Sequence, residues 1–488
     1  MRTSLKSMRS LCLVLLIITT GPQALLYAQA VDRTAPPALE PPPALKLPSI
    51  ERFSLSNGLD VTLMQKHEVP LVQINLIVKT GSAMDPSAKP GLATMMADML
   101  DEGAGGRTAL ELADAVDFLG ADLFASAGYH TTVVGLFTPI SKLDSAMGLL
   151  ADVVLRPSFL KEELERLKKE RLTTFLQWRD QPQAISSVVF SSMLFGPRHP
   201  YGTTTLGTEG SVRSLTVRDL ERFHGQHFHP NNAMLVVVGD VKVDRIRVML
   251  EQAFGKWRGG SLVSVNWPEV SQVEQQVVYL VDKPGSAQSV IRIGRIGVER
   301  TTKDYFSLQV LNTILGGSFA SRLNQNLREE HGYTYGAGSI FDMRPLPGPF
   351  LAASSVQTDV TDKALVEFMN ELRDILKPIP EEDLARGKNY VALGYPENFQ
   401  SVGQIASQLG EMVLYRLPND YFNTYIPNVL GVTGGEVTSA ARTYLDSTKM
   451  IITVVGDRAA IEKGIRALNL GRVEVLSIDD VLGKAPKL

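Results

Sequence analysis

Three histidines lie within six residues, at His224, His227 and His229, and imidazole is the side chain that proteins use most often to bind a metal. The run ends a predicted helix and leads through Pro230 into an apolar strand at 233–238. The negative end of the helix dipole also favours histidine there. We therefore interpret the cluster as a helix ending, and keep a self-sufficient metalloenzyme built on it as the less favoured alternative. We expect the dispersed histidines at the surface or at strand ends: His67, His130, His199 and His331.

Residues 90–102 predict a short helix whose polar face carries unsuitable groups for metal chemistry. A Pro-Gly pair opens the helix, glycines follow it, and apolar residues recur at helical spacing along one face. The other face presents Thr94, Ala97 and Asp98. In the zinc motif His-x-x-Glu-His, these three positions hold the two metal ligands and the general base. A hydroxyl, a methyl group and one carboxylate neither complete a zinc site nor deprotonate a water molecule.

The charge balance argues against a nucleic-acid surface. The chain has 488 residues, a formal net charge of −3 and no long run of Lys or Arg. The densest charged run, residues 161–171, mixes both signs and predicts the solvated face of an amphipathic helix, with pairs such as Glu165 and Lys169.

The N-terminus predicts an exported protein. Basic residues precede the apolar run at 11–18, and a small-x-small sequence ending at Ala30 follows. This order is typical of a secretory signal peptide, whereas a membrane-spanning helix needs about 20 apolar residues. The single cysteine, Cys12, lies inside the segment, so we expect a mature chain without disulfides in the periplasm.

An internal repeat organises the rest of the chain. Residues 61–66 match 278–283, and residues 215–240 match 432–457, both at an offset of 217. We therefore predict an α+β fold of two homologous domains, each an antiparallel-rich mixed sheet covered by helices on one face. The predicted segments are a signal peptide at 1–30, a Pro-rich tether at 31–49, an N-terminal domain at 50–258, a linker at 259–274 and a C-terminal domain at 275–486.

The chain resembles the pitrilysin/insulinase family of zinc metallopeptidases, specifically its two-domain subunits. The resemblance rests on the segments 91–100, 199–202, 230–240 and 316–335, in that order. It implies that the two domains form half of a four-domain clamshell. An active member would place His, Glu and His at positions 94, 97 and 98, and a zinc-binding Glu about 76 residues later, where this chain has Thr174. The resemblance therefore implies a degenerate zinc motif and no metal in this chain.

The resemblance also assigns a role to Arg328 and Tyr335, which lie seven residues apart across a predicted helix, 320–331, and the following strand. In the family, an Arg and a Tyr at this spacing point from the second domain toward the substrate. A guanidinium and a phenol O–H can both donate hydrogen bonds to a substrate carbonyl as it becomes an oxyanion. The alternative is structural, with Arg328 a solvated helix residue paired to Glu330 or a neighbour, and Tyr335 in the sheet core.

These features together predict a non-zinc-binding subunit of a periplasmic heterodimeric metallopeptidase, inactive alone. Arg328 and Tyr335 would act on peptides at a zinc site whose ligands and base belong to a homologous partner with an intact His-x-x-Glu-His. The alternative from a different class is a catalytically inactive clamshell, including a homodimer, that binds peptides or serves as an assembly core. We expect neither nucleic acid nor a stable membrane span after signal cleavage.

Overall fold

The computed structural model describes residues 45–487. The predicted signal peptide and most of the predicted tether lie outside these described residues. The described residues all fall within one compact unit. Among them, no helix combines the length and the apolar character that crossing a membrane requires.

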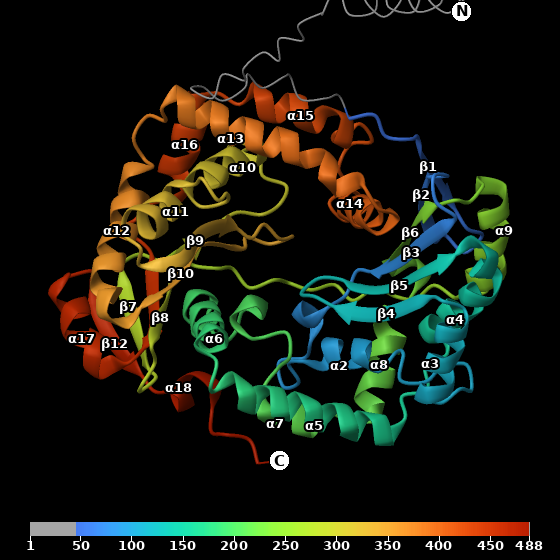
Figure 1. Cartoon of the computed structure of the whole chain (residues 1–488). Coiled ribbons are helices and arrows are strands. Elements are labelled where there is room, and N and C mark those ends of the chain that lie inside the picture. The colour runs from blue at the N-terminus through green and yellow to red at the C-terminus, as the bar shows by residue number, and fades with distance from the viewer. Residues whose placement is uncertain (1–44, 488) are drawn as a thin grey trace, which may run out of the picture. The chain divides into compact units, whose positions relative to one another are not determined.

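The first half of the chain builds a six-stranded mixed sheet with the order β1-β2-β6-β3-β5-β4 (Figure 1). Strands β2 and β6 run parallel, and the other neighbours run antiparallel. A turn at Asn57-Gly58 joins β1 to β2, and Gly58 has φ +83°. The strands are β1 (Ile50–Ser54), β2 (Asp60–Gln65), β3 (Leu71–Val78), β4 (Asp122–Ala127), β5 (Thr132–Pro139) and β6 (Ala233–Gly239).

The second half builds a second six-stranded mixed sheet, with the order β12-β7-β11-β8-β10-β9. Its first five strands in chain order occupy the same relative positions as β2 to β6, and the register repeats as well. Val61 pairs with Leu235 in one sheet, and Val278 pairs with Ile452 in the other, both residues shifted by the repeat offset of 217. The predicted α+β class with two mixed sheets is confirmed. The strands are β7 (Val277–Asp282), β8 (Gln288–Ile296), β9 (Thr334–Phe341), β10 (Pro349–Gln357), β11 (Ile451–Gly456) and β12 (Arg472–Leu476).

Helices connect the strands in both halves. The first half contains α2 (Leu92–Asp98), α3 (Ala109–Phe118), α4 (Leu143–Leu155), α5 (Lys161–Trp178), α6 (Pro182–Phe195), α7 (Glu209–Ser214), α8 (Val217–His227) and α9 (Val243–Phe254). The second half contains α10 (Tyr305–Leu315), α11 (Arg322–Asn324), α12 (Thr361–Asp374), α13 (Glu381–Gly394), α14 (Val402–Leu414), α15 (Tyr421–Gly431), α16 (Gly434–Tyr444), α17 (Arg458–Ala467) and α18 (Ile478–Leu482).

The predicted helix at 320–331 differs from the structure. A short α-helical turn, α11, passes directly into a π-helical segment, η5 (Gln325–Glu330), in which the His331 N–H bonds to the Asn326 carbonyl five residues earlier. Gly332, with φ +66°, then ends the helix as predicted. Such wider turns occur frequently at functional sites.

Two helices are exchanged between the halves. Helix α6 of the first half packs on β8 and β11 of the second sheet, and α14 of the second half packs on β3 and β6 of the first (Figure 1). Strand β6 is therefore buried on both faces, not on one face as predicted. Its residues alternate between two apolar cores, with Leu235 and Val237 in one, and Met234, Val236 and Val238 in the other.

Candidate functional site

Helix α2 carries the positions of the degenerate motif beneath strand β4 (Figure 1). Its predicted apolar stripe is buried, with Met95, Met96 and Met99 fully enclosed. The Asp85 carboxylate accepts hydrogen bonds from Gly91 N (2.7 Å) and Ala93 N (2.8 Å) at the start of the helix. Burial raises the pKa of Asp85 to about 7, although these N–H donors oppose the shift.

A guanidinium lies between the first and last motif positions. Arg171, on α5, donates from Nη1 to the Gly91 carbonyl (3.0 Å) and to Thr94 Oγ1 (3.1 Å), and from Nη2 to the Asp98 carboxylate. The Thr94 hydroxyl in turn donates to the Thr205 carbonyl (2.7 Å). The Arg171 side chain is only 4% exposed, so this ion pair is closed off from solvent on the arginine side. The prediction of a solvated charged run at 161–171 is therefore wrong for Arg171.

The groups at the motif positions do not suit zinc. The Thr94 hydroxyl and the Asp98 carboxylate already bond to Arg171, and Ala97 offers no donor atom. Thr174 bonds to the Glu170 carbonyl of its own helix (3.1 Å). Residues 45–487 contain no group of three His, Cys, Asp or Glu side chains placed to hold a metal. A zinc ion would also meet a fixed positive charge here.

Two of the three clustered histidines, His224 and His227, pack against other parts of the protein. His224 bonds through Nε2 to the Val154 carbonyl (2.9 Å), and burial lowers its pKa to about 4. His227 is buried against Phe223, with ring centroids 4.5 Å apart. This arrangement supports the interpretation of the cluster as a helix ending.

Arg328 lies in the π-helical segment η5, and Tyr335 lies at the start of β9. The Arg328 guanidinium stacks over the Phe319 ring at 4.5 Å and approaches Glu329, the neighbour of Glu330, at 3.5 Å, as the structural alternative expects for this residue. Tyr335 is 91% exposed, and Phe319 is 63% exposed. The alternative of Tyr335 as a sheet core residue is therefore wrong.

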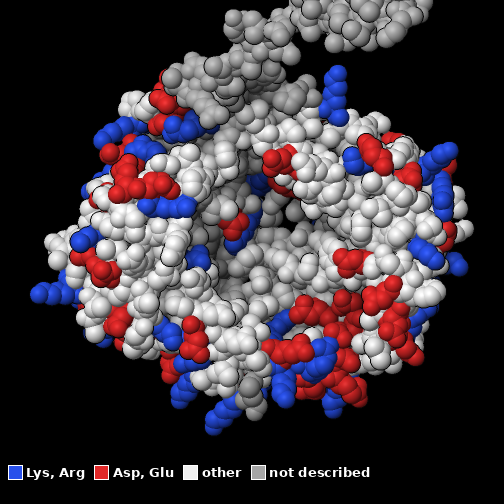
Figure 2. All heavy atoms as spheres, in the orientation of Figure 1, with Lys and Arg blue, Asp and Glu red and all other residues white. Residues whose placement is uncertain are grey.

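The outer edges of the two sheets differ. Beside β9, Ala337 N bonds to Asn324 Oδ1 (3.3 Å) and Ser339 N bonds to the Gly316 carbonyl (3.1 Å), so the chain covers this edge itself. Beside β4, no backbone group of the described residues pairs with the outer edge. A groove next to β4 separates it from α14, and this face of the molecule is hollowed between the two sheets (Figure 2).

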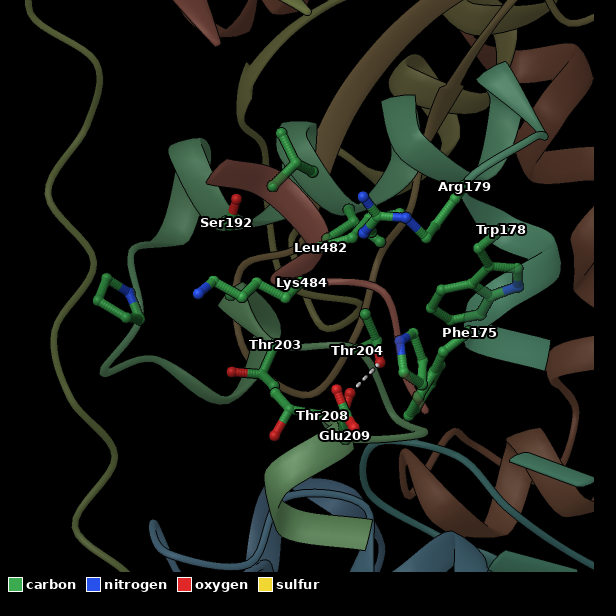
Figure 3. A pocket seen from close by; sticks show the side chains of 16 residues that line it. Phe175, Trp178, Arg179, Ser192, Thr203, Thr204, Thr208, Glu209, Leu482 and Lys484 are labelled. Carbon is green, nitrogen blue, oxygen red and sulfur yellow. Dashed lines mark hydrogen bonds between the residues drawn. The ribbon is translucent and has the colours of Figure 1, made fainter. Parts of the chain in front are cut away.

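A pocket of about 190 Å³ adjoins the motif region. Phe175 and Trp178, one and two turns beyond Arg171 on α5, lie on one side of it, and Lys484 from the C-terminal segment points away from them (Figure 3). Arg179 holds this C-terminal segment by donating to the Gly483 carbonyl (2.6 Å) and by pairing with Asp479. No local pattern in the sequence indicates this packing.

A stacked arginine, which the sequence analysis did not identify, joins the two halves. Arg344, in the β9–β10 loop, lies over the rings of Tyr129 and Tyr201, 4.4 Å from each centroid. His130 bonds to the Tyr201 hydroxyl, and burial together with the charge of Arg344 lowers its pKa to about 4. His199 is 4% exposed against the same tyrosine. His130 lies in the turn between β4 and β5, as expected for a strand-end residue, whereas the expectation is wrong for His199, which is buried.

Comparisons with known proteins agree with this geometry. The family model described as insulinase (peptidase family M16) matches residues 60–194, and the model described as peptidase M16 inactive domain matches residues 214–391. An uncharacterized zinc protease of Rickettsia bellii is 24% identical over 371 residues, which cover 74% of this chain and 87% of that protein.

Solved structures share the fold. The crystal structure of a peptidase M16 inactive domain from Pseudomonas fluorescens superposes with a TM-score of 0.79 at 26% identity, covering 84% of this chain and 98% of that one. A protease from Helicobacter pylori gives a TM-score of 0.76 at 19% identity, covering 84% and 100%, which is a likeness of fold. With both halves matched and the motif positions occupied by Thr94, Ala97 and Asp98, the chain belongs to the insulinase (M16) family of peptidases as a member that lacks the zinc motif.

Proposed function

We propose that the chain is the non-zinc-binding subunit of a periplasmic heterodimeric metallopeptidase. A homologous two-domain partner supplies the zinc, its ligands and the general base through an intact His-x-x-Glu-His. This chain supplies Arg328 and Tyr335 to that site and is inactive alone. Peptides or unfolded segments are the substrates.

The observation that carries the proposal is the exposure of Tyr335. Tyr335 is 91% exposed, so its ring contributes little to the hydrophobic core. The folding of this chain alone therefore does not require an aromatic residue at this position. Arg328, with its side chain 35% exposed, lies on the π-helical segment that precedes the same strand. Phe319 lies beneath the guanidinium and restricts its motion.

These two groups suit the stabilisation of an oxyanion. A guanidinium and a phenol each carry N–H or O–H donors, and their effect grows when a partner subunit excludes water from the site. Neither group is tied to a buried acceptor within the described residues: Arg328 meets only Glu329, at 3.5 Å, and no hydrogen bond involves the Tyr335 hydroxyl. Both donors therefore remain available to a substrate carbonyl.

A second candidate, an inactive peptide-binding clamshell, is favoured by the open edge of β4. An extended peptide could add to this edge as a further strand, since backbone pairing needs no catalytic group. The groove beside it is lined by Asn75, Phe124 and Ser126 from the sheet and by Ser407, Glu411 and Tyr415 from α14.

Co-purification with a secreted two-domain relative that retains His-x-x-Glu-His tests the first proposal. We expect peptide cleavage by the pair only, with zinc bound to the partner. Arg328→Ala and Tyr335→Phe should each lower kcat by about 10²–10³-fold, the usual cost of one oxyanion donor. Tyr390→Phe, at a 56% exposed tyrosine on α13, is the matched control and should keep full activity.

Two results would contradict this function. Unchanged activity in both Arg328→Ala and Tyr335→Phe would remove the catalytic role. Stoichiometric zinc and cleavage by the lone chain would show that it needs no partner. Peptide binding without cleavage, in a complex of any composition, would favour the second candidate.

A further inference from the structure

We propose that the Arg171 guanidinium is a built-in cation that replaces a metal ion as the cross-link between α2 and α5. The proposal concerns this chain alone and holds whether or not a partner subunit exists.

The geometry of the contacts supports this replacement. A metal held by an i, i+4 pair on α2 and by a side chain on a second helix would join the two helices at one point. Arg171 makes the same connection with hydrogen bonds, reaching Thr94 and Asp98 at positions i and i+4. It also reaches the Gly91 carbonyl at the N-terminus of the helix. Five N–H donors in a rigid fork allow one guanidinium to hold three acceptors.

The connection extends to a third segment. The Thr94 hydroxyl lies 2.7 Å from the Thr205 carbonyl and 3.1 Å from the Gly91 carbonyl, both of which only accept, so it accepts from Arg171 through a lone pair. The loop that contains Thr205 is thereby tied to α2. Helix α2, helix α5 and this loop therefore share one centre of positive charge.

Burial distinguishes Arg171 from the other arginine of its helix. Arg166 pairs with Glu102, Glu163 and Glu170, yet its side chain is 44% exposed, as expected for a surface network. Arg171 is 4% exposed and pairs directly with one carboxylate, Asp98, to which the nearby Asp85 adds a weaker attraction. A buried charge is strongly destabilising unless it is paired and hydrogen-bonded, so this pair is a structural requirement.

Restoring the motif should therefore not restore metal binding while Arg171 remains. The positive charge and the volume of the guanidinium lie between the two positions that would have to bind the metal. Zinc should bind only when the motif is restored and the arginine is removed together.

Metal analysis of two full-length variants tests this. The first carries T94H, A97E, D98H and T174E, and the second carries these changes with R171Q. After dialysis against zinc and then buffer, we expect about one zinc per chain in the second variant and less than about a tenth of that in the first. Equal zinc content in the two variants, whether high or low, would overturn the proposal.

Thermal unfolding of single variants provides a test that does not depend on zinc. Arg171→Met leaves Asp98 without its partner, and Asp98→Asn leaves Arg171 without its counter-charge. We expect both to lower Tm by at least about 3 °C. Lys169→Met, on the exposed side of the same helix, is the matched control and should change Tm by less than about 1 °C. Melting of Arg171→Met at the Tm of the control would refute the cross-link.

Discussion

At the scale of single residues, burial sets the protonation of the groups around α2. Asp85 accepts two backbone N–H groups, yet burial raises its pKa to about 7. Burial also raises the pKa of Asp101 to about 6. Between its unfolded and folded pKa values, such a carboxyl group is protonated in the folded chain and ionised in the unfolded chain. Lowering the pH within this range therefore stabilises the folded state.

The raised pKa of Asp85 therefore predicts that the stability of the folded state falls as pH rises. Its folded pKa of about 7 lies above the unfolded value of 3.8, so its contribution is fully present below about pH 4 and is lost as pH rises through 7. Asp85→Asn keeps an acceptor for the helix N-terminus without a charge. The Tm of this variant, relative to that of the wild type, should rise as pH increases from 5 to 8.

The exposed Asp114 on α3 gives the control for this prediction. Asp114→Asn should follow the wild type at every pH when both are measured by thermal unfolding. A constant difference between Asp85→Asn and the wild type across this range would show that Asp85 does not titrate there.

Some residues at the site could be predicted from sequence and others could not. Thr94, Ala97 and Asp98 were identifiable because their spacing lies within one helix. Arg171 contacts them across more than 70 residues, and no local pattern shows such a contact. A clue did exist, since the buried face of α5 runs through Leu164, Lys168, Arg171 and Phe175 at helical spacing, with two cations where apolar residues are expected.

At the scale of elements, each exchanged helix packs on its sheet at a contact between a glycine and a large side chain. The glycine is on the strand in one half and on the helix in the other. Gly294 on β8 leaves room for Phe190 of α6, because an added Cβ would lie 2.8 Å from that ring. In the first sheet, Ile77 stands at the repeat position of Gly294, and Gly410 of α14 faces it, with an added Cβ 2.9 Å from Ile77 Cδ1. The large residue is on the helix in one half and on the strand in the other.

Filling this contact should displace α14. Gly410→Leu forces a side chain against Ile77, and overpacking of this kind costs about 1–3 kcal/mol. Gly403→Leu on the same helix meets only the Gln73 side chain, at 3.9 Å, and should cost less than about 0.5 kcal/mol. Urea unfolding of the two variants measures both values. Equal costs would mean that α14 does not depend on this contact.

The elements themselves were more predictable than their packing. The helix predicted over residues 161–171 and the strand predicted at 233–238 are found in α5 and β6, because each has a clear local pattern. The exchange of α6 and α14 was not predictable, since an amphipathic helix has the same pattern whichever sheet it covers. The π-helical turn at Arg328 was missed for a similar reason, because its sequence reads as an ordinary helix.

At the scale of the whole molecule, the described residues behave as one cooperative unit. Ile185 and Val189 of α6 belong to a core otherwise built by Val281, Val290 and Val455 of the second sheet. In the first sheet, α14 completes the core on the face opposite α2 and α4. The stacking of Arg344 on Tyr129 and Tyr201 adds a further connection between the halves.

Separating the halves should therefore unfold both. A fragment of residues 45–258 would expose the apolar face of α6 and the sheet face that α14 covers. We expect it to be insoluble or to lack a cooperative thermal transition by circular dichroism. Co-expression with residues 259–487 should restore a soluble pair. A cooperative melt of the single fragment at the Tm of the full chain would contradict this expectation.

The exchange of helices also bears on how such a chain evolves. After a duplication, a half that has lost its chemistry is normally free to be deleted. Here α6 from the half with the degenerate motif forms part of the wall around the sheet that carries Tyr335. Selection for a surface on the second half would then preserve the first half, even though the first half lacks the zinc motif.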